Sequence, residues 1–351
     1  MESTVRGSER LTYKDAGVDI EAQDRALAQA FRSVRASFTP GVVGDVGLFG
    51  GMFDPARMGF QDAILVASTD GVGTKLDVAK RAGVHDTVGR DLVQHCINDI
   101  LVQGARPLFF LDYVAMGKLD PPIVADLIRG CAEACRDHGV ALLGGETAEM
   151  SGFYAPGDFE LVGFIVGAAR RGQLIDGSRV RPGQALLGLP SSGLHTNGYT
   201  LARKILFERL GLSLEDRPDE LEGRTVREAL LAVHRCYLEP LWPLVEKKRI
   251  AAMAHITGGG LPGNVNRVLG KCDAVIDRTS WKCPGLFSLL VKGGNLDSTE
   301  AYRAFNMGVG MVLIVDEAEV DEVKGDLEAR GEPTFRIGRT ESGEGRVRWS
   351  R

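Results

Sequence analysis

The chain has 351 residues, of which 42 are Lys or Arg and 47 are Asp or Glu, so its formal net charge is −5. Hydrophobic residues make up 44% and charged residues 25% of the chain, a balance that excludes a disordered chain, a collagen-like repeat and a disulfide scaffold. The acidic balance also argues against a nucleic acid or an anionic membrane as the main partner, because such surfaces require a basic patch.

The cysteines and the first ten residues indicate a cytoplasmic protein. No two of the six cysteines have the C-x-x-C spacing of a zinc or thioredoxin-like site, so we expect buried thiols in a reducing compartment. Residues 1–10 lack the apolar stretch of a signal peptide. Apolar stretches such as 307–315 are shorter than the roughly 18 residues of a membrane helix, so no membrane contact is expected.

The first half of the chain predicts short buried strands that alternate with helices. The strands are expected at 63–68, 108–115, 141–143 and 160–168. Residues 86–103 carry apolar side chains at the helical period, which predicts an amphipathic helix with Gly104 as its C-cap. Residues 121–137 predict a second helix, with Pro122 in its first turn, where the missing N–H costs little.

A polar stretch at 170–183 predicts a connection between two domains, one at 1–170 and the other at 171–351. The second half predicts strands at 185–189, 274–277, 308–315 and 334–339, and helices at 199–210, 226–247 and 318–330. Pro240 and Pro243 predict a break or kink in the long helix at 226–247. We therefore expect an α/β protein of the α+β type, with two α/β domains of similar size.

The sharpest motif follows the strand expected at 63–68 and reads Thr69-Asp70-Gly71-Val72-Gly73-Thr74-Lys75-Leu76. A carboxylate, two glycines and a lysine at the end of a strand place a cation ligand, open backbone N–H groups and a positive charge close together, as in a phosphate and magnesium site. No Walker A loop occurs in the chain. The alternative is a turn with a solvated Asp70 and Lys75.

Two further carboxylates lie near the ends or in the middle of apolar elements. Asp99 interrupts the apolar helix expected at 86–103, where an ionised carboxylate is costly unless it is paired or metal-bound. It shares a helical face with Asp91 and His95, so the alternative is that it points outward. Glu146 follows Gly144 and Gly145 at the end of another strand. Asp70, Asp99 and Glu146 together suggest one shared divalent cation.

Two motifs in the second half suggest a substrate site. Residues 191–198, with Ser192, His195 and Asn197, lie between a strand and a helix and could bind a phosphate or a polar substrate; a capping turn is the alternative. Residues 255–263 satisfy G-x-G-x-x-G, which is a weak dinucleotide signal in a glycine-dense chain. A phosphate nest at 258–260 is more credible than a Rossmann site.

The remaining charged and histidine positions carry weaker signals. Residues 13–19, with Lys14 and Asp15, have no strand or helix period and are either a lid over a nucleotide or a disordered tail. His85, His138 and His234 stand alone in the sequence and are expected to be surface or packing histidines.

Taken together, these segments resemble the family of phosphoribosylformylglycinamidine cyclo-ligases, also called aminoimidazole ribonucleotide synthetases, nearly from end to end. The matching segments are 13–20, 69–76, 98–105, 107–113, 144–150, 191–193 with His195 and 197–199, and 255–260. The resemblance implies an ATP-dependent ring closure of formylglycinamidine ribonucleotide through an iminophosphate, with Mg²⁺. It also implies a homodimer in which strands of the N-terminal domain build a shared barrel.

By position, the resemblance assigns roles to the motifs. The catalytic residues would be Asp99, His195 and His255. The ATP contacts would be Lys14, Asp70, Gly71, Gly73, Thr74, Lys75, Gly144 and Gly145. The substrate contacts would be Ser192, Asn197, Gly258, Gly259 and Gly260. The magnesium ligands would be Asp70, Asp99 and Glu146.

Three positions depart from the family pattern, and two other functions compete. Ser151 and Leu194 stand where the family usually has proline, and Gln23 replaces a common glycine, which changes loop stiffness rather than chemistry. Selenophosphate synthetase, thiamine-monophosphate kinase and a hydrogenase-maturation factor share this architecture, but no cysteine precedes Cys96, which weighs against the first. A nucleotide-sensing protein with a dead site would have lost acids and lysines that this chain retains.

Overall fold

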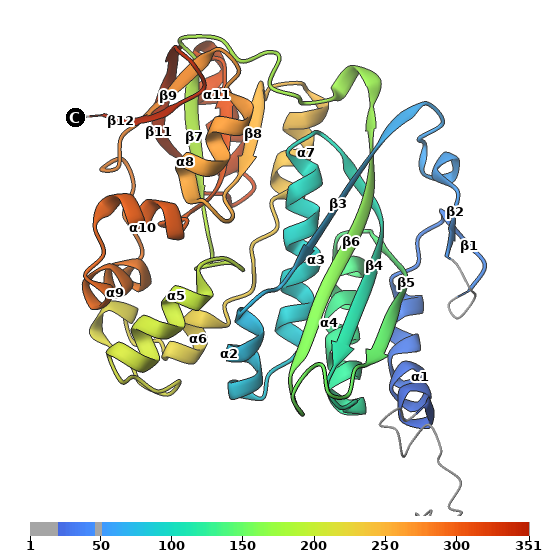
Figure 1. Cartoon of the computed structure of the whole chain (residues 1–351). Coiled ribbons are helices and arrows are strands. Elements are labelled where there is room, and N and C mark those ends of the chain that lie inside the picture. The colour runs from blue at the N-terminus through green and yellow to red at the C-terminus, as the bar shows by residue number, and fades with distance from the viewer. Residues whose placement is uncertain (1–19, 46–50, 351) are drawn as a thin grey trace, which may run out of the picture.

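The computed structural model describes residues 20–45 and 51–350. It contains two main sheets, one in each half of the chain, that lie side by side with helices between and around them (Figure 1). The predicted mixed α/β class is therefore confirmed. A small hairpin of β1 (Val42–Val43) and β2 (Met52–Phe53) precedes the first large sheet. Lys14 lies outside the described residues.

The first sheet has four strands in the order β3, β6, β4, β5. Their bounds are β3 (Ala63–Gly71), β4 (Arg106–Met116), β5 (Ala141–Glu149) and β6 (Phe159–Arg170). Strand β6 pairs antiparallel with β3 and β4, whereas β4 and β5 are parallel. The helices α3 (Asp86–Leu101) and α4 (Pro121–Asp137) pack on one face, and α1 (Ile20–Ala36) packs against α4.

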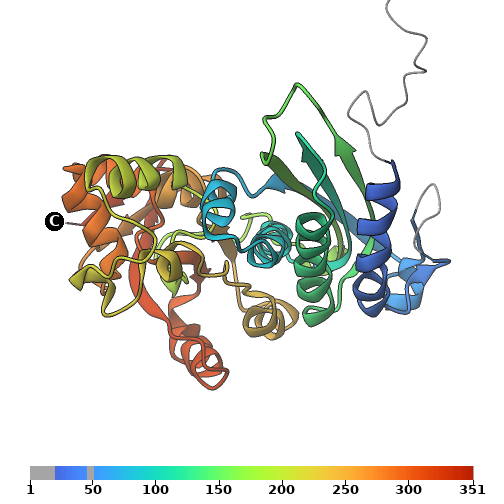
Figure 2. The same cartoon turned by 90° about the horizontal axis from the view of Figure 1, so that it is seen from below.

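The other face of this sheet is free of α-helices among the described residues (Figure 2). Alternation along β4 explains the difference, since Phe110 and Val114 are completely buried beneath the helices whereas Leu111 and Tyr113 point to the other side and are only partly buried. Leu65 and Phe164 on neighbouring strands are 62% and 41% exposed. The free face therefore exposes large apolar side chains.

Helices α3 and α4 approach so closely that two glycines are required at their crossing. A Cβ atom at Gly89 would lie 2.4 Å from the Leu127 carbonyl oxygen, and one at Gly130 would lie 2.0 Å from the Asp86 carbonyl oxygen. Backbone contact of this kind fixes α3, the helix that carries Asp91, His95 and Asp99, tightly in place.

The second sheet has six strands in the order β12, β9, β11, β7, β10, β8. Their bounds are β7 (Ala185–Pro190), β8 (Ala252–His255), β9 (Cys272–Ile276), β10 (Val309–Val315), β11 (Phe335–Ser342) and β12 (Val347–Trp349). All neighbours are antiparallel except β12 and β9. Strand β10 is buried at every position, as its unbroken apolar sequence predicts.

The remaining helices lie before and around the second sheet. Their bounds are α2 (Lys75–Ala82), α5 (Tyr199–Arg203), α6 (Val226–Leu230), α7 (Leu238–Glu246), α8 (Gly260–Val265), α9 (Gly285–Gly294), α10 (Ser298–Ala304) and α11 (Val320–Glu328). The helix expected at 199–210 changes to a π-helix at Lys204–Arg209. The helix expected at 226–247 is interrupted from residue 231 to 237, upstream of both prolines.

Candidate active site

Helix α3 presents three polar side chains, four residues apart, to the second half of the chain. Asp91 and His95 are buried, and the Asp99 side chain is 22% exposed. Asp99 Oδ1 lies 2.9 Å from His255 Nδ1, and Asp99 Oδ2 accepts a hydrogen bond from Ser68 Oγ at 3.2 Å. The alternative that Asp99 points outward is therefore wrong.

Asp70, at the end of β3, reaches the same place from the sheet. His95 Nε2 lies 2.7 Å from Asp70 Oδ2 and 3.5 Å from Asp99 Oδ2. Asp70 Oδ1 also accepts the backbone N–H of Gly71 at 2.7 Å. Two of the three predicted acids thus converge on one imidazole, although they are 29 residues apart in the sequence.

The convergence shifts the pKa values of the groups that meet. Burial of the His95 ring opposes its protonation, but the contacts with Asp70 and Asp99 outweigh burial and raise the pKa of His95 to about 9. Burial likewise opposes ionisation of Asp99, yet its contacts with His255 and His95 hold its pKa well below the usual value. At neutral pH the group is an imidazolium between two carboxylates.

Three more histidines pack beside His95. His195 stacks on His234 with ring centroids 3.9 Å apart, and the His255 ring lies 5.1 Å from the rings of both His95 and His234. Burial comes first among the causes that keep the pKa values of His195 and His234 well below normal, and the neighbouring histidines add to it. Of the two alternatives expected for His234, a surface or a packing histidine, the surface one is wrong, because the side chain is buried and stacked within this cluster.

Lys75 does not face solvent. Its side chain is fully buried, with Nζ 2.7 Å from Asp91 Oδ2 and donating to the Ala232 carbonyl at 2.8 Å. Burial lowers the pKa of Lys75, and the contact with Asp91 opposes that effect. The structure therefore corrects the prediction that Lys75 binds ATP phosphates: its charge is matched by Asp91.

Glu146 is not brought to Asp70 and Asp99. The strand register places Asp70 and Gly145 in one row across the sheet, on the two edge strands β3 and β5. Gly163 on β6 and Asp112 on β4 lie between them in that row. Three strand spacings of about 4.8 Å separate the first and last positions of this row. Glu146 pairs with Tyr113 on the free face instead. The prediction of one cation shared by all three acids is wrong within a single chain.

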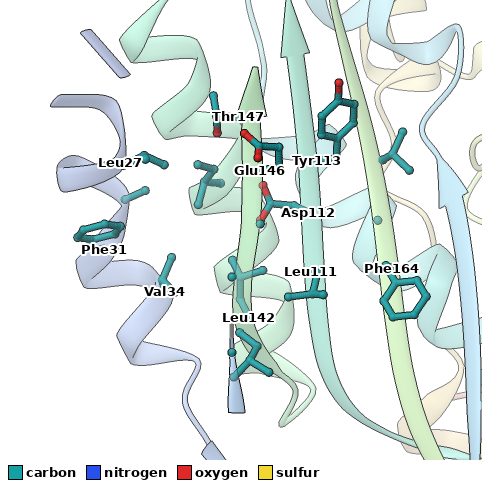
Figure 3. A pocket seen from close by; sticks show the side chains of 18 of the residues that line it. Leu27, Phe31, Val34, Leu111, Asp112, Tyr113, Leu142, Glu146, Thr147 and Phe164 are labelled. Atoms are coloured by element: carbon teal, nitrogen blue, oxygen red, sulfur yellow. The ribbon is translucent and has the colours of Figure 1, made fainter. Parts of the chain in front are cut away.

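Glu146 lines a cavity of about 590 Å³ between α1, the edge strand β5 and the free face (Figure 3). Gly144 and Gly145 also line it, together with Thr69 and Asp112. Gly145 is required there because a Cβ atom would lie 2.4 Å from Asp112 Oδ1. Burial raises the pKa of Asp112 to about 7.

The two substrate motifs of the second half meet each other. A Cβ atom at Gly258 would lie 3.3 Å from Asn197 Oδ1, so residues 61 positions apart are neighbours. Ser192 Oγ donates to the Val233 carbonyl at 2.6 Å, and the Ser192 N–H donates to His195 Nε2 at 3.1 Å. His195 adopts a φ of 63°, which aims its ring back at this turn.

The remaining glycines and Thr74 have mainly structural contacts here. Gly73 has a φ of +67° and leads into α2, and Thr74 Oγ1 lies 2.9 Å from Thr200 Oγ1. Gly259 has a φ of +92°. A Cβ atom at Gly260 would lie 1.9 Å from the Tyr302 carbonyl oxygen, so this glycine permits close packing of α8 against α10.

Comparison with known proteins identifies first the class of protein and then the family to which the chain belongs. Models of AIR synthase related proteins match residues 54–169, as the N-terminal domain, and 181–350, as the C-terminal domain. Phosphoribosylformylglycinamidine cyclo-ligases of Trichlorobacter lovleyi and Geobacter metallireducens are 49% and 50% identical over 335 residues, which is 95% of this chain and of each relative. The chain therefore belongs to the phosphoribosylformylglycinamidine cyclo-ligase family, the C–N bond-forming ligases of purine biosynthesis.

Solved structures support the fold. Thiamine-monophosphate kinase from Stenotrophomonas maltophilia has a TM-score of 0.69 at 19% identity, with 92% of this chain and 96% of that chain covered. Hydrogenase maturation protein HypE in complex with ATP has a TM-score of 0.67 at 20% identity, with 93% and 90% covered. Among the described helices, none combines the length and apolarity that crossing a bilayer requires.

Proposed function

We propose that this chain closes the imidazole ring at the expense of ATP, with Asp70 and Asp99 at the phosphoryl group and His195 and His255 at the substrate. The amide oxygen of formylglycinamidine ribonucleotide attacks the γ-phosphorus, and ADP leaves. The amidine nitrogen then attacks the activated carbon, and phosphate departs with that oxygen to give 5-aminoimidazole ribonucleotide. The supporting observation is the convergence of Asp70, Asp99 and His255 from β3, α3 and β8.

The residues present fit Mg²⁺ at Asp70 and Asp99. Both carboxylates approach His95 Nε2, so their oxygens converge on one place, where Mg²⁺ would take over the charge pairing that the His95 imidazolium provides in this structure. Carboxylate oxygens are the ligands that Mg²⁺ prefers. When bound, Mg²⁺ neutralises and aligns phosphate oxygens for transfer. Glu146 is left out of this proposal because it lies on the free face of the sheet.

ATP and the substrate would then contact different parts of the chain. Gly71, Gly73 and Thr74 follow Asp70 at the start of α2, where they would serve the phosphates. The cavity beside Gly144 and Gly145 has the volume of a ligand pocket and would take another part of ATP. Lys14 stays a prediction, because its segment lies outside the described residues.

The substrate side would be formed by the turn that carries Ser192 and Asn197. Asn197 lies beside Gly258, which follows the strand that ends at His255. The hydroxyl and amide groups of this turn, with the backbone of Gly259 and Gly260, are suited to a ribose phosphate. The proposal also includes two domains, at 1–170 and 171–351, and a cytoplasmic location.

A homodimer would cover the free face of the first sheet. Exposed Leu65 and Phe164 on that face are large apolar side chains, and a second copy of the same sheet would remove them from water. A shared barrel of strands from two chains, as the family resemblance implies, accounts for this surface.

The decisive experiment mixes the pure protein, Mg²⁺, ATP and formylglycinamidine ribonucleotide, and follows ADP and 5-aminoimidazole ribonucleotide together. We expect one ADP for each imidazole product. ADP formation without the imidazole product would contradict the proposal. Thiamine monophosphate serves as the control acceptor, and preferential phosphorylation of it would favour the kinase function instead.

A further inference from the structure

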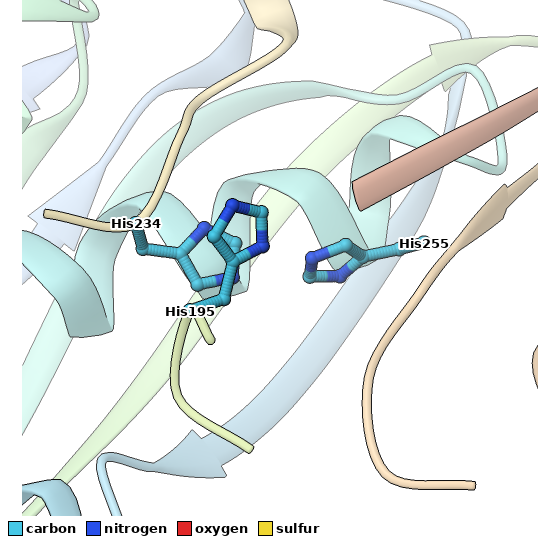
Figure 4. Close-up of side chains that lie close together, drawn as sticks. All are labelled: His195, His234 and His255. Atoms are coloured by element: carbon cyan, nitrogen blue, oxygen red, sulfur yellow. The ribbon is translucent and has the colours of Figure 1, made fainter. Parts of the chain in front are cut away.

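Three imidazole rings meet in the interior with ring nitrogens that lack hydrogen-bond partners. His195 follows β7, His234 lies between α6 and α7, and His255 ends β8 (Figure 4). Their exposures are 1%, 1% and 6%. One nitrogen from each ring lies within 4.8 Å of the other two. In the described part of the chain, His195 Nδ1, His234 Nε2 and His255 Nε2 are buried without a partner.

The opposite nitrogens of two of these rings are held by acceptors. His255 Nδ1 lies 2.9 Å from Asp99 Oδ1, and His234 Nδ1 lies 3.1 Å from the Arg235 carbonyl oxygen. Because a carboxylate and a carbonyl only accept, both Nδ1 atoms carry the proton. Each Nε2 therefore points a lone pair into the cluster. A carboxylate or carbonyl behind the imidazole is the usual support of a metal-binding histidine.

We propose that His195, His234 and His255 form a binding site for a divalent first-row transition metal ion of the Zn²⁺ class. Neutral imidazole nitrogens suit Zn²⁺, Co²⁺ and Ni²⁺. Three such ligands leave a fourth position open for water or an oxygen of a bound molecule. This site differs from the proposed Mg²⁺ site, since Mg²⁺ requires oxygen ligands such as those of Asp70 and Asp99.

His195 is the ligand that must adjust. Its Nε2 accepts the Ser192 N–H, so in the neutral ring the proton resides on Nδ1. Metal binding through Nδ1 releases that proton, Nε2 takes up one from solvent, and the Ser192 N–H loses its acceptor. The stacking on His234 also requires the ring to turn. Binding of the ion therefore costs the hydrogen bond between the Ser192 N–H and His195 Nε2.

The test uses the whole protein, freed of metals by a chelator and without ATP or substrate. Cobalt chloride is titrated and the visible ligand-field absorption of Co²⁺ is followed, with calorimetry of Zn²⁺ as a second measurement. We expect one ion per chain. In His234→Gln the affinity should fall at least about tenfold, as for loss of a ligand or its support.

Two variants make the result specific. His138 also has buried ring nitrogens without partners in the described structure, but it lies outside the three-histidine group; His138→Gln should bind like the unaltered protein. His95→Gln should also retain the site, whereas an ion held by His95, Asp99 and His255 would be lost. Circular dichroism and a urea titration establish that each variant is folded.

Absence of Co²⁺ binding by the unaltered protein would overturn the proposal whatever the variants do. So would binding that is unchanged in His234→Gln, or lost in His95→Gln alone. Because no substrate is present, these outcomes are independent of the proposed ring closure.

Discussion

Asp99 is the residue on which the proposed chemistry depends most. It contacts Ser68, His95 and His255, which lie on three different elements. Asp99→Asn keeps the shape and removes the charge, so the fold should persist while turnover falls about 10²-fold or more, as expected when charge stabilisation is lost from a transition state. The measurement is joint formation of ADP and 5-aminoimidazole ribonucleotide.

A matched substitution separates this effect from a general change of charge. Asp62, whose side chain is 81% exposed and pairs with Arg171 on the surface, provides it. Asp62→Asn should leave turnover unchanged. Near-normal turnover of Asp99→Asn would remove Asp99 from the reaction.

Lys75 and Asp91 form a buried ion pair whose role differs from the one expected from sequence. Removing one partner leaves an uncompensated buried charge, which costs about 3–5 kcal/mol. Lys75→Met should therefore lower the free energy of unfolding by that amount in urea titrations, rather than leave the fold intact. Lys75→Met combined with Asp91→Leu should recover part of the loss, and the remainder reflects the His234 N–H that Asp91 no longer accepts. A Lys75→Met protein that is as stable as the unaltered protein but binds ATP more weakly would support the prediction from the sequence that Lys75 contacts the ATP phosphates.

His95 should make stability depend on pH above neutrality. Its pKa is raised from 6.5 to about 9 in the folded chain because, although burial opposes protonation, Asp70 and Asp99 favour it. The stabilisation, about 3 kcal/mol, is thus complete below pH 6.5 and lost as pH rises through 9. Unfolding by urea in Mg²⁺-free buffer from pH 6 to 10 measures it. His95→Gln should show a flatter profile over this range, and equal slopes would contradict the assignment.

At the scale of elements, the interruption from residue 231 to 237 is held by side chains of α3. Asn98 Nδ2 donates to the Arg235 carbonyl at 2.7 Å, and Asn98 Oδ1 accepts the Tyr237 N–H at 2.9 Å. Asp91 accepts the His234 N–H at 2.7 Å. These bonds give three backbone groups of the segment partners outside a helix, which stabilises the departure of the chain from the helical path.

Asn98→Ala should therefore release this segment. Two buried backbone groups lose their partners at about 1–3 kcal/mol each, so the free energy of unfolding should fall by roughly 2–6 kcal/mol. Faster amide exchange at Tyr237 provides a local measurement. Asn98→Asp keeps an acceptor for the Tyr237 N–H but places a buried carboxylate against the Arg235 carbonyl oxygen, so it should lose at least as much. Unchanged exchange in Asn98→Ala would show that other contacts hold the segment.

The sequence pattern predicts a helix or strand well where interactions between residues close in the sequence determine it. Helix α4 has the predicted bounds 121–137 because Asp120 caps it and its apolar period is regular. The interruption at 231–237 depends on Asp91 and Asn98, more than 130 residues earlier, so Pro240 and Pro243 point to the wrong place. His234 carries no periodic or motif signal, and only the fold brings it to His195 and His255.

The same reasoning applies to the site. Asp70 and Asp99 could be recognised because acids at the ends or interior of apolar elements need a partner. Glu146 satisfies that rule equally well, but strand order separates it from them, and strand order is not encoded in any one motif. Lys75 could not be distinguished from a phosphate ligand, because its partner Asp91 belongs to another helix.

At the scale of the whole molecule, the exposed apolar side chains on the free face of the first sheet predict that two chains associate through this face. A charge placed among Leu65, Phe164 and their copies would be buried without a partner, which weakens association by several kcal/mol. Phe164→Glu should therefore raise the dissociation constant of the proposed dimer about 10²-fold or more. Light scattering coupled to size exclusion measures this over a range of concentrations.

Leu210→Glu is the control, because Leu210 is an exposed apolar side chain in the second half of the chain, away from the sheet; it should leave the dimer intact. A monomeric unaltered protein at micromolar concentration, or a Phe164→Glu dimer as tight as the unaltered one, would contradict assembly through this face. Because the cavity beside Glu146 opens between α1 and that same face, loss of the dimer should also weaken ATP binding, whereas Asp99→Asn should impair turnover with the dimer intact. The two variants therefore separate assembly from phosphoryl transfer.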